Sequence, residues 1–171
     1  MHLRRATEAE LPEVVALVNT AFRGSEGWAV EFQVVAGPRL TLESLRADIA
    51  AKPGAFQLIS RDEADNTLLG SAWIEPITPT LWYLGLLCVR PDAQTRQLGR
   101  TLLAATEAFA RDRGAQRMRI SVMNVRDTLA AWYERRGYIR TGETKPFPYG
   151  DTTVGTPLRD DLSFIVLEKQ L

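Results

Sequence analysis

Small and basic side chains gather directly after an apolar run, over residues 94–100. The run, residues 84–89, is closed by Arg90-Pro91, which is typical of a buried strand that ends in a tight loop. Helical spacing begins after the loop, so these side chains would surround a helix N-terminus, where free N–H groups and the helix dipole attract anions. This arrangement suits a phosphate or pyrophosphate, although an ordinary strand-to-helix connection with solvated arginines explains it equally well.

Few other residues offer catalytic chemistry on their own. The single cysteine, Cys88, lies inside the apolar run, where a thiol is more often an inert hydrophobe than an acyl-accepting nucleophile. The single histidine, His2, lies near the first residue, and no His/Cys/carboxylate group has the spacing of a metal site. We therefore expect no metal and no internal disulfide.

The composition is that of an ordinary globular chain without a charge bias. With 171 residues, 45% of them hydrophobic, we expect one domain over residues 1–171. Lys plus Arg and Asp plus Glu both number 21, which argues against nucleic acid or an anionic membrane as a partner. The chain does not open with a charged segment followed by an apolar one, so a cytoplasmic location is the default expectation.

Periodicity predicts the elements that position these residues. Helices are expected after the capping pair Thr7 and Glu10, over residues 41–49, after Gln97 and after Asn124. Strands are expected at residues 2–6, 56–60, 68–75, 81–89, 117–122, 138–141 and 162–167. The buried faces of the last two helices are predicted to hold Leu98, Leu102, Ala105 and Phe109, and Leu129, Trp132 and Tyr133. This order of elements predicts an α/β or α+β sheet covered by helices.

Two segments resemble motifs of the GNAT N-acetyltransferase superfamily. Val89, Arg90-Pro91 and Gln94-Thr95-Arg96-Gln97-Leu98-Gly99 resemble its motif A, Q/R-x-x-G-x-G/A after a strand, with Gln97 in place of the first glycine. Because that glycine lets the backbone approach a pyrophosphate, the Cβ of Gln97 either fits with φ below zero or pushes the cofactor away. Asn124 and the later Tyr133-Glu134-Arg135-Arg136-Gly137-Tyr138 are similar to motif B, an asparagine before a helix ending Y-x-x-x-G-F/Y. Two motifs in this order are more specific than either alone.

The resemblance implies the GNAT fold, a mixed and mostly antiparallel sheet of six or seven strands flanked by about four helices. Its fourth and fifth strands splay apart to admit acetyl-CoA. The backbone of Leu87 and Val89, with Cys88 between them, would bind the pantetheine arm like an added strand, and an N–H near Val89 would polarise the thioester carbonyl. Asn124 would hold the arm from the other side. The residues expected to cradle the pyrophosphate are Gln94, Thr95, Arg96, Gln97, Leu98, Gly99 and Arg100.

The implied reaction moves an acetyl group from acetyl-CoA to a primary amine of a small molecule or peptide, by direct attack in a ternary complex. Tyr133 matches the family position that protonates the departing CoA thiolate, although it would also serve as a core aromatic beside Trp132. A phenol has a pKa of about 10 and a thiol about 8.5, so the transfer needs a local shift or concerted protonation. Arg135 or Arg136 beside Tyr133 would instead favour the phenolate.

The base and the acceptor are less defined by the sequence. Six residues before the valine, where some members carry a glutamate base, this chain has Tyr83. Tyr83 acting through water, or Glu75 at the end of the preceding strand, would take the proton from the amine. Trp28, Glu31 and Phe32 lie where members of the family bind acceptors, yet the two aromatics would also pack onto the domain. The acidic residues that could attract a cationic amine, or simply be solvated, are Glu143, Asp151, Asp160 and Asp161.

Two other classes stay open. A non-catalytic acyl-CoA-binding sensor or regulatory module would keep the cradle without turnover, as Gln97 and the absent glutamate suggest. A nucleotide-binding protein of the P-loop or dinucleotide type is disfavoured, because the loop has neither GK[ST] nor G-x-G-x-x-G. Assembly as a homodimer is common in the family and is possible here.

Overall fold

A seven-stranded sheet organises the computed structural model, which describes residues 1–24, 31–92 and 97–171 and only the backbone of residue 32. The strands are ordered β1-β3-β4-β5-β6-β9-β7, and β5 and β6 form the one parallel pair within the described chain. The expectation of a mixed, mostly antiparallel sheet is confirmed. The strands are β1 (Arg4–Arg5), β3 (Phe56–Arg61), β4 (Leu68–Pro76), β5 (Leu81–Val89), β6 (Arg117–Met123), β7 (Ile139–Pro146) and β9 (Ser163–Gln170).

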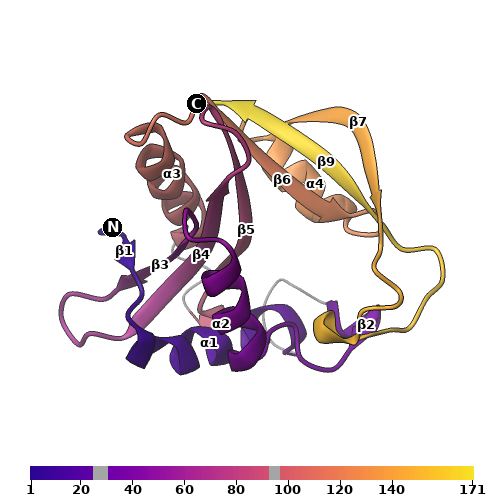
Figure 1. Ribbon diagram of the computed structural model, residues 1–171, viewed down its shortest axis with the longest axis horizontal. Coiled ribbons are helices and arrows are strands. Elements are labelled where there is room, and N and C mark those ends of the chain that lie inside the picture. The colour runs from indigo at the N-terminus through magenta and orange to yellow at the C-terminus, as the bar shows by residue number, and fades with distance from the viewer. Residues whose placement is uncertain (25–30, 93–96) are drawn as a thin grey trace.

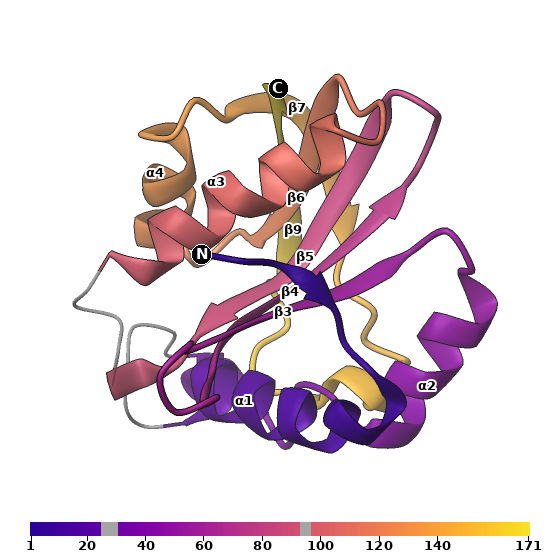
Figure 2. The same cartoon turned by 90° about the vertical axis from the view of Figure 1, so that its left-hand side faces the viewer.

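Helices cover both faces of the sheet. In the described part of the chain the α-helices are α1 (Leu11–Arg23), α2 (Leu42–Ala51), α3 (Leu98–Arg111) and α4 (Asp127–Glu134). Figure 2 shows α1 and α2 below the strands and α3 and α4 above them. Neighbouring residues of β3 mark the division, because Leu58 packs into the core beneath α3 and α4, whereas Ile59 packs into the core beneath α1 and α2.

The buried face of α3 differs from the predicted one. Leu102 is buried as expected, and so are Leu103, Thr106, Glu107 and Ala110. The predicted core positions that stay partly exposed are Leu98, Ala105 and Phe109. The apolar pattern missed the polar members, which are buried because they are paired. The Thr106 hydroxyl donates to the Leu102 carbonyl at 2.8 Å, and Glu107 accepts from Lys169 at 2.6 Å.

The face of α4 also needs a correction. Ala130 and Tyr133 are buried, whereas Leu129 and Trp132, which were predicted to be buried, are only partly so. The guanidinium of Arg136 lies over the Trp132 ring, 3.6 Å from its centroid. A charged group that stacks on an aromatic face keeps its polar edge near water, so Trp132 stays close to the surface.

The central strands β5 and β6 pair only at their first three residues. Leu81, Trp82 and Tyr83 are in register with Arg117, Met118 and Arg119, and no further pairing follows. Figure 1 shows the two strands diverging from this point. On its other edge β5 stays paired to β4, with a β-bulge between Gly85 and Cys88 and a left-handed Leu86 at φ 49°. The expected splay of the fourth and fifth strands of the sheet is therefore present.

A second, two-stranded sheet was not predicted. It joins β2 (Val35–Ala36) to β8 (Thr156–Pro157), next to short 3₁₀ turns at Glu31–Gln33 and Thr152–Val154. Arg23 at the end of α1 holds this sheet, because its guanidinium donates to the carbonyls of Val35 at 2.8 Å and Val154 at 2.9 Å. These strands are too short to show a periodic pattern in the sequence.

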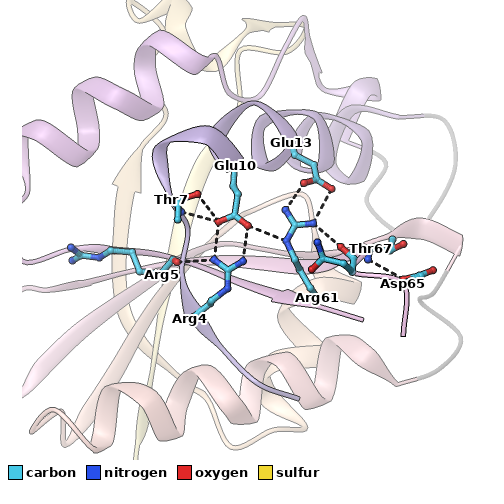
Figure 3. A network of polar contacts seen from close by, with 9 residues as sticks. Arg4, Arg5, Thr7, Glu10, Glu13, Arg61, Asp65 and Thr67 are labelled. Atoms are coloured by element: carbon cyan, nitrogen blue, oxygen red, sulfur yellow. Dashed lines mark hydrogen bonds and ion pairs between the residues drawn. The ribbon is translucent and has the colours of Figure 1, made fainter. Parts of the chain in front are cut away.

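Charged side chains join the start of α1 to β3 on the outside of the molecule (Figure 3). Glu10 is the last residue of the 3₁₀ turn Glu8–Glu10. Its carboxylate accepts hydrogen bonds from Arg4 at 2.6 and 2.7 Å and from Arg61 at 3.1 Å. Arg61 also pairs with Glu13 at 2.5 Å. Thr7 donates to Glu10 as the predicted capping pair.

No helix of the described chain is long and apolar enough to cross a membrane.

Candidate active site

The divergence of β5 and β6 opens a cleft of about 1240 Å³ through the centre of the molecule. Its walls are residues 84–89 of β5 and residues 119–123 of β6, together with side chains from α1, α3 and α4. Clefts of this size are the usual binding sites of extended cofactors and small substrates. The cleft therefore collects residues from both predicted motifs and from the predicted acceptor region.

The β5 wall contains the predicted residues Leu87, Cys88 and Val89. Because β6 has turned away, no strand of the described chain pairs with this edge of β5 beyond Tyr83. The bulge at Leu86 places one extra residue outside the ladder with β4. Burial raises the pKa of the Cys88 thiol to about 12, so it stays protonated and unreactive, as the sequence suggested.

The loop that should cradle the pyrophosphate is only partly described. Gln94, Thr95 and Arg96 lie outside the described residues, whereas Gln97, Gly99 and Arg100 line the cleft at the start of α3. Of the two alternatives for Gln97, a φ below zero is not adopted, because its φ is 57°, and displacement of the cofactor by its Cβ stays a prediction. A left-handed conformation costs a non-glycine residue about 1 kcal/mol, so Gln97 occupies a position suited to the glycine of the motif. Leu98, also predicted in the cradle, is not part of the cleft lining.

Three arginines cluster beside the start of α3. Arg100 and Arg136 line both the cleft and a smaller depression of about 490 Å³, which also includes Arg135. Burial lowers the pKa of Arg136, and repulsion from Arg135 and Arg100 lowers it further. Its Nε is buried without a hydrogen-bond partner in the described chain. A bound anion would relieve both the repulsion and the missing hydrogen bond.

Tyr133 reaches the cleft from α4. Its ring is only 8% exposed and packs edge to face against Trp132 and Tyr138, with centroids 4.9 and 5.4 Å away. Burial raises the pKa of Tyr133 well above the ordinary value of a phenol, and the charge of Arg136 opposes this only in part. Arg136 thus favours the phenolate as suggested, but burial outweighs its effect on the pKa of Tyr133, and the phenol keeps its proton at neutral pH.

The two candidate bases face each other across the β4–β5 pair, where Glu75 is in register with Tyr83. Both line the cleft. Glu75 is already engaged, because Lys52 lies 2.8 Å from its Oε2 and the Trp73 indole donates to the same oxygen at 3.0 Å. Burial raises the pKa of Tyr83, while Arg39 and a hydrogen bond with Ser121 lower it less. At neutral pH Tyr83 is a neutral phenol, which can relay a proton but cannot accept one as phenolate.

Asn124 lies just beyond β6 and is used within the protein. Its Oδ1 accepts from the backbone N–H of Ser163 at 3.0 Å, and its Nδ2 donates to the carbonyl of Asp161 at 2.9 Å. These bonds hold the start of β9 against the end of β6. Asn124 is outside the lining of the cleft, so a role in holding the pantetheine arm stays a prediction.

The predicted acceptor region contributes one described side chain to the cleft. Trp28 and the side chain of Phe32 lie outside the described residues, whereas Glu31 lines the cleft and is only 6% exposed. Its Oε1 lies 3.3 Å from Nη1 of Arg126, and its Oε2 lies 3.6 Å from Nε of Arg23. Burial raises the pKa of Glu31, although Arg39, Arg126 and Arg23 all lower it. No motif in the sequence pointed to these three arginines.

The acidic residues considered for a cationic acceptor do not gather at the cleft. Glu143 pairs with Arg119 at 3.2 Å, and Asp161 pairs with Arg159 at 2.6 Å. Asp151 caps the turn at Thr153 with a hydrogen bond of 2.9 Å, and Asp160 is exposed. None of the four is in the cleft lining. No group of three or more potential metal ligands occurs in the part of the chain that the structure describes.

Comparison with known proteins assigns the family. A sequence profile of the acetyltransferase (GNAT) family matches residues 18–138, which is more than half of the chain. The chain therefore belongs to the GNAT acetyltransferase family. This family transfers acetyl groups and uses acetyl-CoA as the donor. No curated protein sequence is significantly similar to this chain.

Solved structures of the same family share the fold. A ribosomal-protein-alanine N-acetyltransferase from Brucella melitensis is 23% identical with a TM-score of 0.70, and the match covers 100% of both chains. A spermidine N-acetyltransferase from Vibrio cholerae is 14% identical with a TM-score of 0.69, over 99% of this chain and 95% of that chain. A GNAT acetyltransferase from Elizabethkingia anophelis, solved with acetyl-CoA bound, is 11% identical with a TM-score of 0.65, over 99% and 97%. At these levels of identity the likeness shows the fold alone.

Proposed function

We propose that the protein moves an acetyl group from acetyl-CoA to a primary amine of a small molecule or peptide, by direct attack in a ternary complex. The observation that carries this proposal is the early divergence of β5 from β6, which opens a cleft between them in a member of an acetyltransferase family. A cleft open along its length can hold the donor and the acceptor together, which direct attack requires.

The donor would lie along the free edge of β5. The pantetheine amides would bind the backbone of Leu87 and Val89 as an added strand binds a sheet edge. An N–H of the bulged segment would polarise the thioester carbonyl and stabilise the oxyanion of the tetrahedral intermediate. The family's acetyl-CoA thus fits a backbone edge that the described protein itself leaves unpaired.

The phosphates of the donor would bind at the start of α3. Backbone amides from Gln97 to Arg100 would face the phosphates, with the positive end of the helix dipole behind them. Arg100, Arg135 and Arg136 would supply the charge, and the repulsion of Arg136 by the other two favours an anionic ligand. The predicted contributions of Gln94, Thr95 and Arg96 belong to the same proposal.

Tyr133 would protonate the departing CoA thiolate. The raised pKa supports the proton-donating form, since the phenol is fully protonated before reaction. A phenol of high pKa is also a weak acid, so the proton would move as the C–S bond breaks rather than before it. The C–S bond would break with its electron pair on the CoA sulfur, which takes the hydroxyl proton of Tyr133 and leaves as a neutral thiol. The tyrosinate that remains would recover its proton from solvent.

Deprotonation of the amine would use the Tyr83 side of the cleft. Tyr83 would pass the proton of the ammonium through water towards Glu75, its register partner. Lys52 already lies 2.8 Å from Oε2 of Glu75, so this carboxylate is engaged before an amine binds. The same pairing favours the second candidate, an acyl-CoA-binding sensor without turnover.

A coupled assay separates the two candidates. The purified protein is incubated with acetyl-CoA and a panel of amines, and the release of CoA thiol and the mass of the product are measured. Acetyl transfer to any amine, dependent on protein, supports the enzyme. Binding of acetyl-CoA without transfer to any member of a broad panel would contradict the enzyme and favour the sensor.

A further inference from the structure

The acceptor end of the cleft contains more positive than negative charge in the described residues. Arg126 and Arg23 lie 3.3 and 3.6 Å from the two oxygens of Glu31, and Arg39 exerts the strongest charge effect on the same carboxyl. One carboxylate therefore faces three guanidinium groups. Nε of Arg23 and Oε2 of Glu31 are both buried without a hydrogen-bond partner among the described residues. These two atoms face each other as an ion pair at 3.6 Å, so it is the excess of positive charge that a ligand would complete.

The three arginines are not equally available. Arg23 donates to the carbonyls of Val35, Gly37 and Val154, so its guanidinium is committed to the small sheet. Arg126 is 7% exposed and committed to Glu31. The guanidinium of Arg39 makes no hydrogen bond or ion pair with any described residue, and it lines the cleft. Glu31 thus neutralises its neighbours in part. Among the described residues Arg39 contacts the Phe22 ring, 5.8 Å from its guanidinium carbon, and this contact leaves its N–H groups available to an anion.

The backbone at Arg39 is held in place before any ligand binds. Oδ1 of Asn19 accepts from the N–H groups of Arg39 at 2.7 Å and Leu40 at 3.0 Å. Nδ2 of Asn19 donates to the Leu40 carbonyl at 2.8 Å. The segment is therefore fixed on α1, and less ordering is required on binding. Arg39 and Tyr83 both line the cleft, and the pairing of β5 with β6 ends at Tyr83, so an anion on Arg39 would share the cleft with the point where the strands part.

We propose that the acceptor is an amine that also carries a carboxylate, as in a free amino acid, and that Arg39 binds this carboxylate. The planar guanidinium suits a carboxylate through paired hydrogen bonds, and the amine of an α-amino acid would then point towards the diverging strands. This inference rests on the proposed acetyl transfer. It also agrees with the absence from the described cleft lining of the four acidic residues considered for a purely cationic amine, which are Glu143, Asp151, Asp160 and Asp161.

Binding of matched ligands tests the proposal without requiring turnover. The protein saturated with CoA is titrated calorimetrically with the twenty amino acids and with their carboxamides, which keep the α-amine and lose the negative charge. We expect at least one amino acid to bind at least tenfold tighter than its carboxamide. Equal binding of every acid and its amide, or binding of none, would overturn the proposal.

Three variants assign the preference to Arg39. Arg39→Gln should reduce the acid-to-amide ratio to near one, whereas Arg39→Lys should retain part of it because the charge remains. The matched control is Arg46→Gln, which removes an exposed arginine that pairs with Glu8 outside the cleft. An unchanged ratio in Arg39→Gln, with a melting temperature like that of the wild type, would contradict the role of Arg39.

A parallel assay keeps the two proposals distinguishable. The amino acid that binds is tested as an acceptor with acetyl-CoA, and the acetylated product is measured by mass. Preference for the acid without any transfer would contradict the enzymatic function while the carboxylate site stands. Transfer to amines with no preference for a carboxylate would support the enzyme and overturn the site at Arg39.

Discussion

Two of the arginine and glutamate clusters among the described residues, the outer network and the cleft cluster, are built differently. The outer network pairs Arg4 and Arg61 with Glu10 and Glu13, so positive and negative charges match (Figure 3). The cleft cluster sets one carboxylate, Glu31, against three arginines. The first arrangement is complete within the protein, whereas the second is completed only by a ligand.

The pKa values of the two carboxyls shift in opposite directions. Hydrogen bonds from Arg4 hold the pKa of Glu10 far below its usual value. Burial raises the pKa of Glu31 despite the arginines around it. The charged form of Glu10 therefore stabilises the fold, and the charged form of Glu31 destabilises it. We infer that substitutions in the outer network change the free energy of unfolding and leave turnover unaltered. Substitutions in the cleft change ligand binding or turnover more than they change stability.

The largest effect is expected from a negative charge at the start of α3. Gly99→Asp would place a carboxylate against the donor's pyrophosphate and lower acetyl-CoA affinity by roughly 100-fold or more. Gly99→Ala is the matched control, because a Cβ there meets Trp132 at an ordinary 3.7 Å. Calorimetry with both variants measures the difference. Similar affinities in Gly99→Asp and Gly99→Ala would contradict the cradle at α3.

Removal of the proposed acid is the next test. Tyr133→Phe should lower kcat by roughly 100-fold, the usual contribution of a positioned acid, and leave the affinity for acetyl-CoA nearly unchanged. The ring packing against Trp132 and Tyr138 is preserved, so the melting temperature should stay close to that of the wild type. An unchanged kcat would remove Tyr133 from the mechanism.

In the outer network, Glu10→Gln should reduce the free energy of unfolding at neutral pH by about 1 kcal/mol and leave turnover unaltered. The pKa of Glu10 is lowered in the folded state, so its stabilisation is complete above the unfolded value of 4.5 and is lost as the pH falls further. Urea unfolding from pH 7 down to pH 3 should show the two proteins converging in stability. A constant difference at all pH values would contradict the ionic role of Glu10.

The smallest effect is expected from Glu31→Gln, with the opposite dependence on pH. The folded pKa of Glu31 is raised, so its contribution is full below the unfolded value of 4.5 and is lost as the pH rises through the folded value. In Glu31→Gln the free energy of unfolding should therefore fall less steeply above pH 4.5 than in the wild type, and the difference should be less than about 1 kcal/mol. The same urea experiments measure this. A steeper loss of stability with rising pH in the variant would show that Glu31 is not destabilised by burial.

The elements and the two motifs were predictable from the sequence because they depend on local patterns. The alternation of Met118, Ile120 and Val122 fixed β6, whereas α4 ends at Glu134 rather than just before Gly137, where the sequence pattern placed its end. The face of α3 was misjudged because buried polar residues such as Thr106 interrupt its apolar pattern. The left-handed Gln97 could not be predicted, because only the tertiary structure imposes that conformation on a residue with a Cβ.

The acceptor end was the least predictable part of the site. Arg23, Arg39 and Arg126 are far apart in the sequence, and each resembles an ordinary surface arginine there. Folding brings them around Glu31, whose place near the acceptor was expected but whose burial was not. Chemistry that depends on long-range contacts leaves no periodic signal, whereas a loop and helix that bind phosphate do.

Selective binding of CoA tests the central claim most directly. The wild-type protein is titrated calorimetrically with acetyl-CoA, CoA, ATP and NAD at one fixed salt concentration. We expect both CoA species to bind and ATP and NAD to bind at least tenfold more weakly, because only CoA combines the phosphates with a pantetheine arm that fits the free edge of β5. No binding of either CoA species at millimolar concentration would contradict the proposed cofactor site and the mechanism built on it.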